Sequence, residues 1–253
     1  MLMGNFRESP MQVTIANVSS IPQHAFRSAV AAIAKQVRRD FAPEWGIRAT
    51  LKAVQLPLGK KRAPIQKDAD AVIYFGDSSS DPTTGVKGAL GYHSANNARL
   101  PYGFVYRDIC KEYDEVWTET LSHEVLELLG DPDVLLTVAG PNPKNHQHTV
   151  YYDLEVCDPT QGDSYSIDRV KVSNFVGKAY FRMTGGNGRT NHMSLPLRPF
   201  GVRPNGYLQY ETGSTSHEIY GPSVTPRKKA AKKKMGKVRR NGRRAARHGT
   251  RQK

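Results

Sequence analysis

His123, Glu124 and Glu127 lie in the stretch Ser-His-Glu-Val-Leu-Glu and have the residue types and spacing of a metal-dependent hydrolytic site. Residues four apart share one face of a helix, so His123 and Glu127 can point at the same ion. Glu124 is rotated by about 100° from His123 and can reach a water on that ion. In the His-Glu-x-x-His pattern of zinc hydrolases, two histidines bind the metal and the glutamate is the general base. The stretch therefore predicts a metal site at which Glu124 activates water.

Glu127 occupies the position at which that pattern has its second histidine. A carboxylate oxygen is an acceptable zinc ligand, but it adds negative charge to the site, weakens the Lewis acid and admits harder metals. We therefore expect Zn²⁺ as the cofactor, with Mn²⁺ and Ca²⁺ as alternatives.

Three carboxylates are candidates for a third ligand. Glu155 is preferred, because one large branch of zinc peptidases takes a carboxylate from the segment that follows the active helix. Asp133 comes ten residues after His123, and Gly130 between them can turn the chain back to the metal. Asp131 is a nearer rival. A helix-ending turn explains either aspartate equally well, since Asp beside Pro is common in turns.

His93 and Cys157 are the remaining residues with possible chemistry. His93 follows Gly-Tyr on the strand side of the fold, and we expect it to bind substrate or stabilise an oxyanion. Cys157 lies in Asp153–Asp158, a segment with four possible ligands, but a lone cysteine is most often a small buried hydrophobe.

The elements that must position these residues alternate between helices and strands. An apolar stripe predicts a helix from Pro22 that ends at Pro43, and a second stripe predicts the active-site helix over 114–130. Predicted strands span 11–18, 50–56, 69–75, 89–93, 102–109 and 150–156, with a hairpin within 164–181. Residues from Thr184 onward are rich in loop-forming types. This order indicates an α+β domain with a mixed sheet.

Residues 227–253 carry the whole excess of positive charge. They hold 14 of the 37 Lys and Arg residues and none of the 23 Asp and Glu residues. Such a run is typical of a disordered segment that binds polyphosphate by releasing counterions, and it offers no aromatic platform for bases. An anionic membrane and a plain solubility tail are the alternatives. The expected nucleic-acid-binding residues are Arg227, Lys228, Lys229, Lys232, Lys233, Lys234, Lys237, Arg239, Arg240, Arg243, Arg244 and Arg247.

The domain organisation that follows is one domain over 1–226 and a basic tail over 227–253. The sequence has two cysteines, too few for a disulfide framework. It shows neither a signal-peptide pattern at its start nor an apolar run long enough to span a bilayer. We expect a cytoplasmic protein, of a host cell or associated with a phage particle.

Several of these motifs together resemble a group of bacterial and phage proteins related to the zincin metallopeptidases. The segments that carry the resemblance are Arg39–Gly46, Ala89–His93, Ser122–Glu127, Asp131–Pro132, Glu155–Pro159 and Val172–Val176. The resemblance as a whole extends over residues 25 to 181. The resemblance implies a zincin-like fold, in which an N-terminal helix and the active-site helix pack on a mixed sheet, and a metal-dependent peptidase activity.

The function expected from the sequence is therefore a metal-dependent hydrolase of peptide or protein substrates, tethered to nucleic acid by its tail. In that hypothesis the strand over Tyr102–Ile109 pairs with an extended peptide at the sheet edge. The alternative is an inactive zincin-fold scaffold that serves as a nucleic-acid-associated or phage structural protein.

Overall fold

A five-stranded mixed sheet forms one half of the molecule. The computed structural model describes residues 9–56, 69–79, 91–95, 100–213 and 215–233. The strands are β1 (Met11–Asn17), β2 (Ala49–Gln55), β3 (Ala71–Gly76), β4 (Gly91–Ala95) and β5 (Pro101–Tyr106). Their order in the sheet is β2-β1-β3-β5-β4, and all pairs are parallel except β4 with β5.

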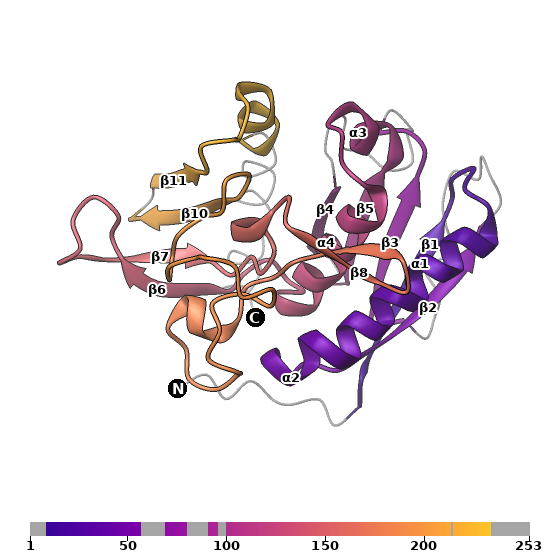
Figure 1. Cartoon of the computed structure of the whole chain (residues 1–253), viewed down its shortest axis with the longest axis horizontal. Coiled ribbons are helices and arrows are strands. Elements are labelled where there is room, and N and C mark those ends of the chain that lie inside the picture. Colours follow the sequence, from indigo (N-terminus) through magenta and orange to yellow (C-terminus); the bar gives the residue numbers. More distant parts are fainter. Residues whose placement is uncertain (1–8, 57–68, 80–90, 96–99, 214, 234–253) are drawn as a thin grey trace, which may run out of the picture.

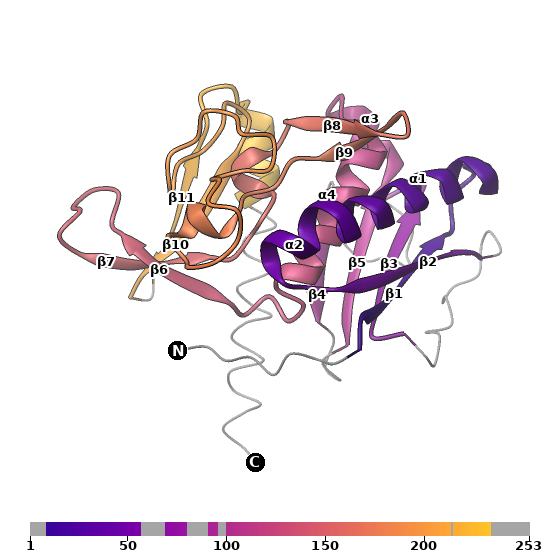
Figure 2. The same cartoon turned by 60° about the horizontal axis from the view of Figure 1, so that its bottom comes forward.

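The N-terminal helix α1 (Gln23–Gln36) packs its predicted stripe against this sheet (Figure 2). Phe26, Val30 and Ile33 are buried, and the Phe26 ring lies 5.7 Å from that of Phe75 on β3. The prediction that Pro43 ends the helix is wrong. A π-helical turn over Val37–Phe41 leads into α2 (Ala42–Trp45), and Gly46 in the left-handed conformation ends the run. Pro43 is tolerated because it lies in the first turn of α2, where an amide hydrogen has no helical partner.

The central helix α4 (Trp117–Gly130) carries the candidate site and is buried along almost its whole length. It lies beside α1 on the same face of the sheet, next to β4 and β5 (Figure 2). The strand expected over 102–109 stops at Tyr106, and the chain turns into a short helix, α3 (Arg107–Glu112).

A four-stranded antiparallel sheet lies beside the first half (Figure 1). Its order is β11-β10-β7-β6, with β6 (Thr137–Pro141), β7 (Thr149–Asp153), β10 (Tyr207–Thr212) and β11 (Thr215–Tyr220). A separate hairpin, β8 (Ser164–Ile167) and β9 (Val170–Ser173), packs on α4, and β9 also contacts α1. Single 3₁₀ turns span Asp158–Thr160 and Lys178–Phe181. The hairpin over 164–181 was predicted in position, whereas β10 and β11 were not.

The fold is thus a mixture of α and β elements, as the predicted α+β class requires. Residues 226–233 form a helix, whereas a disordered tail was expected from residue 227 onward. Among the described residues, no helix has the length and apolar character that a bilayer-spanning helix needs. The predicted tail residues from Lys234 onward lie outside the described part of the chain.

Candidate metal centre

Buried polar bonds fix helix α4 immediately before the predicted ligands. The hydroxyl of Ser122 donates to Gln36 Oε1 on α1 at 2.7 Å and accepts the amide N–H of Ser173 on β9 at 3.0 Å. Thr118 Oγ1 donates to the carbonyl of Lys171 at 2.7 Å. The helix is therefore held on two sides, and the side chain that follows Ser122 has a defined direction.

His123 and Glu127 lie on one face of α4, as their spacing predicts. His123 Nε2 is 3.2 Å from Glu127 Oε1 and 3.2 Å from Asp158 Oδ1. Burial alone would lower the pKa of the His123 ring, but the two carboxylates outweigh it, and the pKa lies well above its usual value. The backbone N–H of Asp158 donates to Glu127 Oε1 at 3.2 Å. Asp158 therefore presents both its backbone N–H and its carboxylate to helix α4.

A second group of possible ligands forms on the opposite side of Glu127. His93, Glu127 and Glu155 have ligand atoms that all lie within 4.8 Å of one another, and all three side chains are buried. His93 Nδ1 is 3.7 Å from Glu124 Oε2 and 3.9 Å from Glu127 Oε2. Neither ring nitrogen of His93 has a hydrogen-bond partner. The carboxylates of Glu127 and Glu155 therefore lie close to the imidazole of His93, and both nitrogens of that ring are without a hydrogen bond.

Glu127 belongs to both groups, since His123, Glu124 and Glu127 also lie within 4.8 Å of one another. We call the two groups the outer triad (His123, Glu124, Glu127) and the inner triad (His93, Glu127, Glu155). Glu127 directs Oε1 toward His123 and Oε2 toward His93. A carboxylate with one oxygen on each side joins the triads into one cluster.

Charge in this cluster is unbalanced. Four carboxylates are at least 95% buried, and the two imidazoles that accompany them supply at most two positive charges; the carboxylates belong to Glu124, Glu127, Glu155 and Asp158. Buried carboxylates are costly unless they are paired or coordinate a metal. Glu124 Oε2 has no hydrogen-bond partner. Two imidazoles and several carboxylates are a donor set that suits a divalent transition metal, so the residues present fit a bound ion.

Gly130 lets the segment with Glu155 approach the end of α4. A Cβ at this position would lie 3.3 Å from Val156 Cγ1, closer than an ordinary van der Waals contact. Val156 is fully buried and joins Glu155 to Cys157. The glycine therefore acts through close packing on the downstream segment, whereas the sequence suggested that it turns the chain toward Asp133.

The two aspartates after α4 lie outside both triads. Asp131 uses its carboxylate as a turn cap, accepting the N–H groups of Leu135 at 3.0 Å and Leu136 at 2.9 Å. Asp133 is only partly buried and joins neither group of possible ligands found among the described residues. The turn interpretation of these aspartates is the one that this geometry favours.

His93 and Asp158 take places that the sequence did not assign to them. His93 was predicted to contact substrate, yet it is fully buried against the carboxylates, as a ligand would be. Asp158 lies in the acidic segment Asp153–Asp158, from which Glu155 was preferred by analogy with one branch of zinc peptidases. The strand in fact ends at Asp153, and Asp158 begins a 3₁₀ turn.

Cys157 lies between these residues without joining a triad. Burial, with the nearby charge of Glu127, raises the pKa of its thiol well above the usual value. A high pKa disfavours the thiolate that binds metals. The expectation that Cys157 is a buried hydrophobe fits this environment. Cys110 is likewise buried and free, with a pKa raised by burial to about 12.

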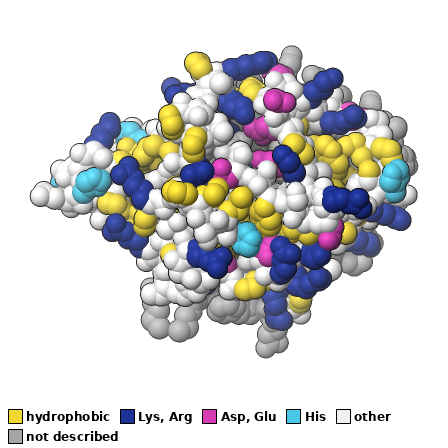
Figure 3. Space-filling model, in the orientation of Figure 1, with side chains coloured by type: hydrophobic (Ala, Val, Ile, Leu, Met, Phe, Trp, Pro, Cys, Tyr) yellow, Lys and Arg dark blue, Asp and Glu magenta, His cyan; other side chains and the backbone are white. Residues whose placement is uncertain are grey.

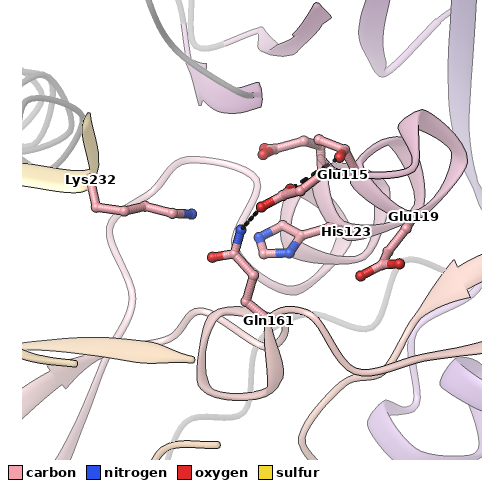
Figure 4. Close-up of a pocket in the computed structure, with 7 residues that line it drawn as sticks. Glu115, Glu119, His123, Gln161 and Lys232 are labelled. Atoms are coloured by element: carbon pink, nitrogen blue, oxygen red, sulfur yellow. Dashed lines mark hydrogen bonds between the residues drawn. The ribbon is translucent and has the colours of Figure 1, made fainter. Parts of the chain in front are cut away.

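A pocket opens on the outer triad (Figure 4). His123 and Glu124 of the outer triad line it, together with Glu119 on α4 and Glu115 just before α4. Burial, together with the charge of Glu115, raises the pKa of Glu119. Gln161 Nε2 donates to Glu115 Oε1 at 3.3 Å across the mouth. His123 and Glu124 are therefore the cluster residues that meet the pocket.

The described part of the basic tail contacts the body of the protein. Arg227 pairs with Glu112, and Lys228 Nζ lies 3.1 Å from Glu115 Oε1. Lys232 lines the pocket, whereas Lys233 is exposed. On the face shown in Figure 3, Lys and Arg side chains are spread over the surface with Asp and Glu among them, not gathered into one basic patch.

Comparison with known proteins identified no relative of this chain. The chain matches no family model, no curated protein and no solved structure. The candidate function is therefore argued from the side chains and their arrangement.

Proposed function

We propose that the protein is a metal-dependent hydrolase whose ion is held by the cluster around Glu127. The observation that carries the proposal is a set of buried polar atoms without hydrogen-bond partners: both ring nitrogens of His93, and Glu124 Oε2. Either triad offers three ligands, the number that a catalytic zinc site takes from the protein. A bound divalent metal supplies Lewis acidity, which lowers the pKa of water and polarises a carbonyl.

The second imidazole bears on the identity of the metal. The sequence pointed to one histidine among carboxylates, a set that also admits Ca²⁺. His93 adds a nitrogen donor, and nitrogen ligands favour Zn²⁺ and other transition metals over Ca²⁺, which takes oxygen ligands. Zn²⁺ is therefore the favoured cofactor, and Mn²⁺ is the second.

Glu124 is the residue best placed to act as general base. It is one of the residues that line the pocket, where a substrate could reach the cluster, and its Oε2 has no hydrogen-bond partner that would have to be displaced. A carboxylate in this position can accept a proton from water as the water attacks a carbonyl. Ser122 and its bonds to α1 and β9 keep this part of the helix in place.

A peptide is the substrate that the neighbouring sheet favours. Among the described strands, β4 is at the edge and carries His93 into the cluster, whereas β5 lies between β3 and β4. The expectation that the strand over Tyr102–Ile109 offers the free edge is therefore wrong. An extended peptide paired with β4 would pass next to the cluster. The N-terminal helix, α4 and an antiparallel edge strand also agree with what the zincin resemblance implies.

Nucleic acid remains the proposed partner of the basic tail. The charge of residues 227–253 supports it, since polyphosphate binding needs basic charge and no folded reader. Arg227, Lys228 and Lys232 already have acidic partners in the body of the protein. We therefore assign nucleic-acid binding chiefly to the residues after 233.

The test is hydrolysis of a peptide mixture by the zinc-loaded protein and by its Glu124→Gln variant. Loss of a general base is expected to lower kcat by about 10² to 10⁴ while metal content is unchanged. A Glu124→Gln protein as active as wild type would overturn the mechanism. Metal binding with no cleavage of any peptide by wild type would favour the inactive scaffold.

A further inference from the structure

The pocket above the outer triad is acidic and already holds a lysine of the same chain. Glu115, Glu119 and Glu124 contribute three carboxylates to its lining, and Lys232 reaches into it from the opposite side (Figure 4). Lys232 Nζ lies 3.8 Å from Asp158 Oδ1 and 4.3 Å from the centre of the Tyr207 ring. Its side chain is only 13% exposed. Lysine is rarely buried to this extent unless a partner compensates it.

The helix over 226–233 brings Lys232 to this position through basic residues that each have a partner (Figure 1). Arg227 pairs with Glu112 at the end of α3 and lies over the ring of Tyr113 at 5.2 Å. Lys229 lies over Tyr220 on β11 at 5.5 Å. The segment thus bridges α3 and the β10–β11 hairpin, and the pocket lies between these anchors.

Two features of the pocket suit an ammonium group rather than this lysine alone. The ion pair that Lys232 makes among the described residues is with Asp158, so the lining carboxylates of Glu119 and Glu124 are not paired with it. Tyr207 offers an aromatic face, which attracts cations. Carboxylates in the lining, with an aromatic ring against the ammonium that occupies the pocket, are the chemistry that recognises lysine and arginine side chains.

We propose that this pocket is a binding subsite for a basic side chain of another polypeptide, and that Lys232 is its resident occupant. The inference that basic peptides are the substrate class of the hydrolase rests on the proposed function. The inference that the pocket binds a basic side chain does not depend on catalysis. A tethered occupant competes at a high effective concentration, so an incoming peptide must displace it. The pocket and the cluster share His123 and Glu124, so a basic side chain in the pocket lies next to the proposed general base.

The experiment measures binding of the peptide acetyl-Ala-Lys-Ala-amide to the full chain by calorimetry. Lys232→Met removes the charge and keeps a long apolar side chain over Tyr207. Lys233→Met is the matched control, since Lys233 is the exposed neighbour. We expect Lys232→Met to bind the peptide about tenfold more tightly than wild type, and Lys233→Met to bind like wild type. The same peptide with an acetylated lysine is expected not to bind.

Equal affinity of wild type and Lys232→Met, or binding of the acetylated peptide, would overturn the inference. A further change, Glu119→Gln in the Lys232→Met chain, is expected to weaken binding, and no loss would contradict the role of the acidic lining. The binding assay also separates the two proposals. Binding of the lysine peptide, with no cleavage of any peptide by the zinc-loaded wild type, would remove the hydrolase and keep the subsite. Cleavage of peptides by wild type, with equal affinity of wild type and Lys232→Met for the lysine peptide, would keep the hydrolase and remove the subsite.

Discussion

Two buried glutamates of this protein, Glu44 and Glu124, have opposite surroundings. Glu44 is 3% exposed, and its carboxylate accepts the backbone N–H of Lys178 at 2.8 Å and that of Asn187 at 2.7 Å. Glu124 is 4% exposed, and its Oε2 has no hydrogen-bond partner.

The loops around Glu44 are shaped to provide donors. A Cβ on Gly177 or Gly186 would collide with the Glu44 carboxylate, so glycine is needed for the backbone to come close enough. Nothing comparable serves Glu124, whose nearest ion-pair candidate is His93 at 3.7 Å. The comparison teaches that this chain satisfies the Glu44 carboxylate with backbone N–H groups and leaves Glu124 Oε2 without a hydrogen-bond donor, which a bound cation would replace.

The largest expected effect is stabilisation of the cluster by metal. A ligand that binds only the folded state at a thousandfold excess over its Kd adds about 4 kcal/mol to the free energy of unfolding. We expect Zn²⁺ to raise the Tm of wild type accordingly and to leave unchanged that of Glu127→Gln, which lacks the carboxylate common to both triads. His148→Ala, which removes an exposed histidine in the β6–β7 loop, is the control and is expected to respond like wild type. An equal response in all three proteins would mean that zinc binds elsewhere.

The next effect tests the donors around Glu44. Glu44→Gln replaces one acceptor oxygen by an amide nitrogen that faces a backbone N–H. Leaving a buried donor unsatisfied costs about 2 kcal/mol of unfolding free energy, measurable by urea denaturation. A variant as stable as wild type would show that these bonds do not hold the loop of Asn187.

The same substitution at Glu124 is expected to have the opposite sign. In metal-free protein, Glu124→Gln removes one negative charge from a cluster of buried carboxylates and is expected to stabilise the fold by about 1 kcal/mol. Urea denaturation in the presence of a chelator measures it. Destabilisation as large as that of Glu44→Gln would mean that Glu124 is a structural residue, and the contrast between the two glutamates would fail.

The smallest effect concerns Asp40, which links α1 to the β8–β9 hairpin. Burial alone would raise its pKa, but hydrogen bonds from Arg39 and from the Tyr165 hydroxyl outweigh it and hold the pKa below its usual value. A lowered folded pKa stabilises the protein above the unfolded pKa, and the contribution disappears as the pH falls through the folded pKa. Asp40→Asn is expected to cost about 0.5–1 kcal/mol at pH 7, and the cost is expected to shrink as the pH falls below the unfolded pKa toward the folded one. A pH-independent difference would contradict this assignment.

Local patterns predicted the parts of the site that lie on one helix. His123 and Glu127 are four residues apart, and the apolar stripe of α4 fixes which face is buried, so their meeting required no tertiary information. Glu155 was predicted as a ligand and lies with Glu127 in the inner triad. The choice among Glu155, Asp131 and Asp133 depended on a fold that periodicity does not determine.

The residues that were missed depend on contacts between distant segments. His93 meets Glu124 only because β4 pairs antiparallel with β5 at the sheet edge, a register that no local pattern sets. The helix over 226–233 has few apolar residues of its own, and its contacts are ion pairs and aromatic faces of other elements. The β10–β11 hairpin follows a region dominated by Gly, Asn, Pro and Arg, which carries no strand periodicity.

The most direct test of the central claim is the metal content of the folded, untagged protein, measured by elemental mass spectrometry after purification without chelators from zinc-supplemented culture. Glu127 belongs to both triads, so Glu127→Gln is the variant that removes both. Glu44→Gln is the matched control at a buried glutamate outside the cluster. We predict about one equivalent of zinc or more in wild type and Glu44→Gln, and loss of it in Glu127→Gln. Folded wild type without stoichiometric metal, or Glu127→Gln with as much metal as wild type, would contradict the account.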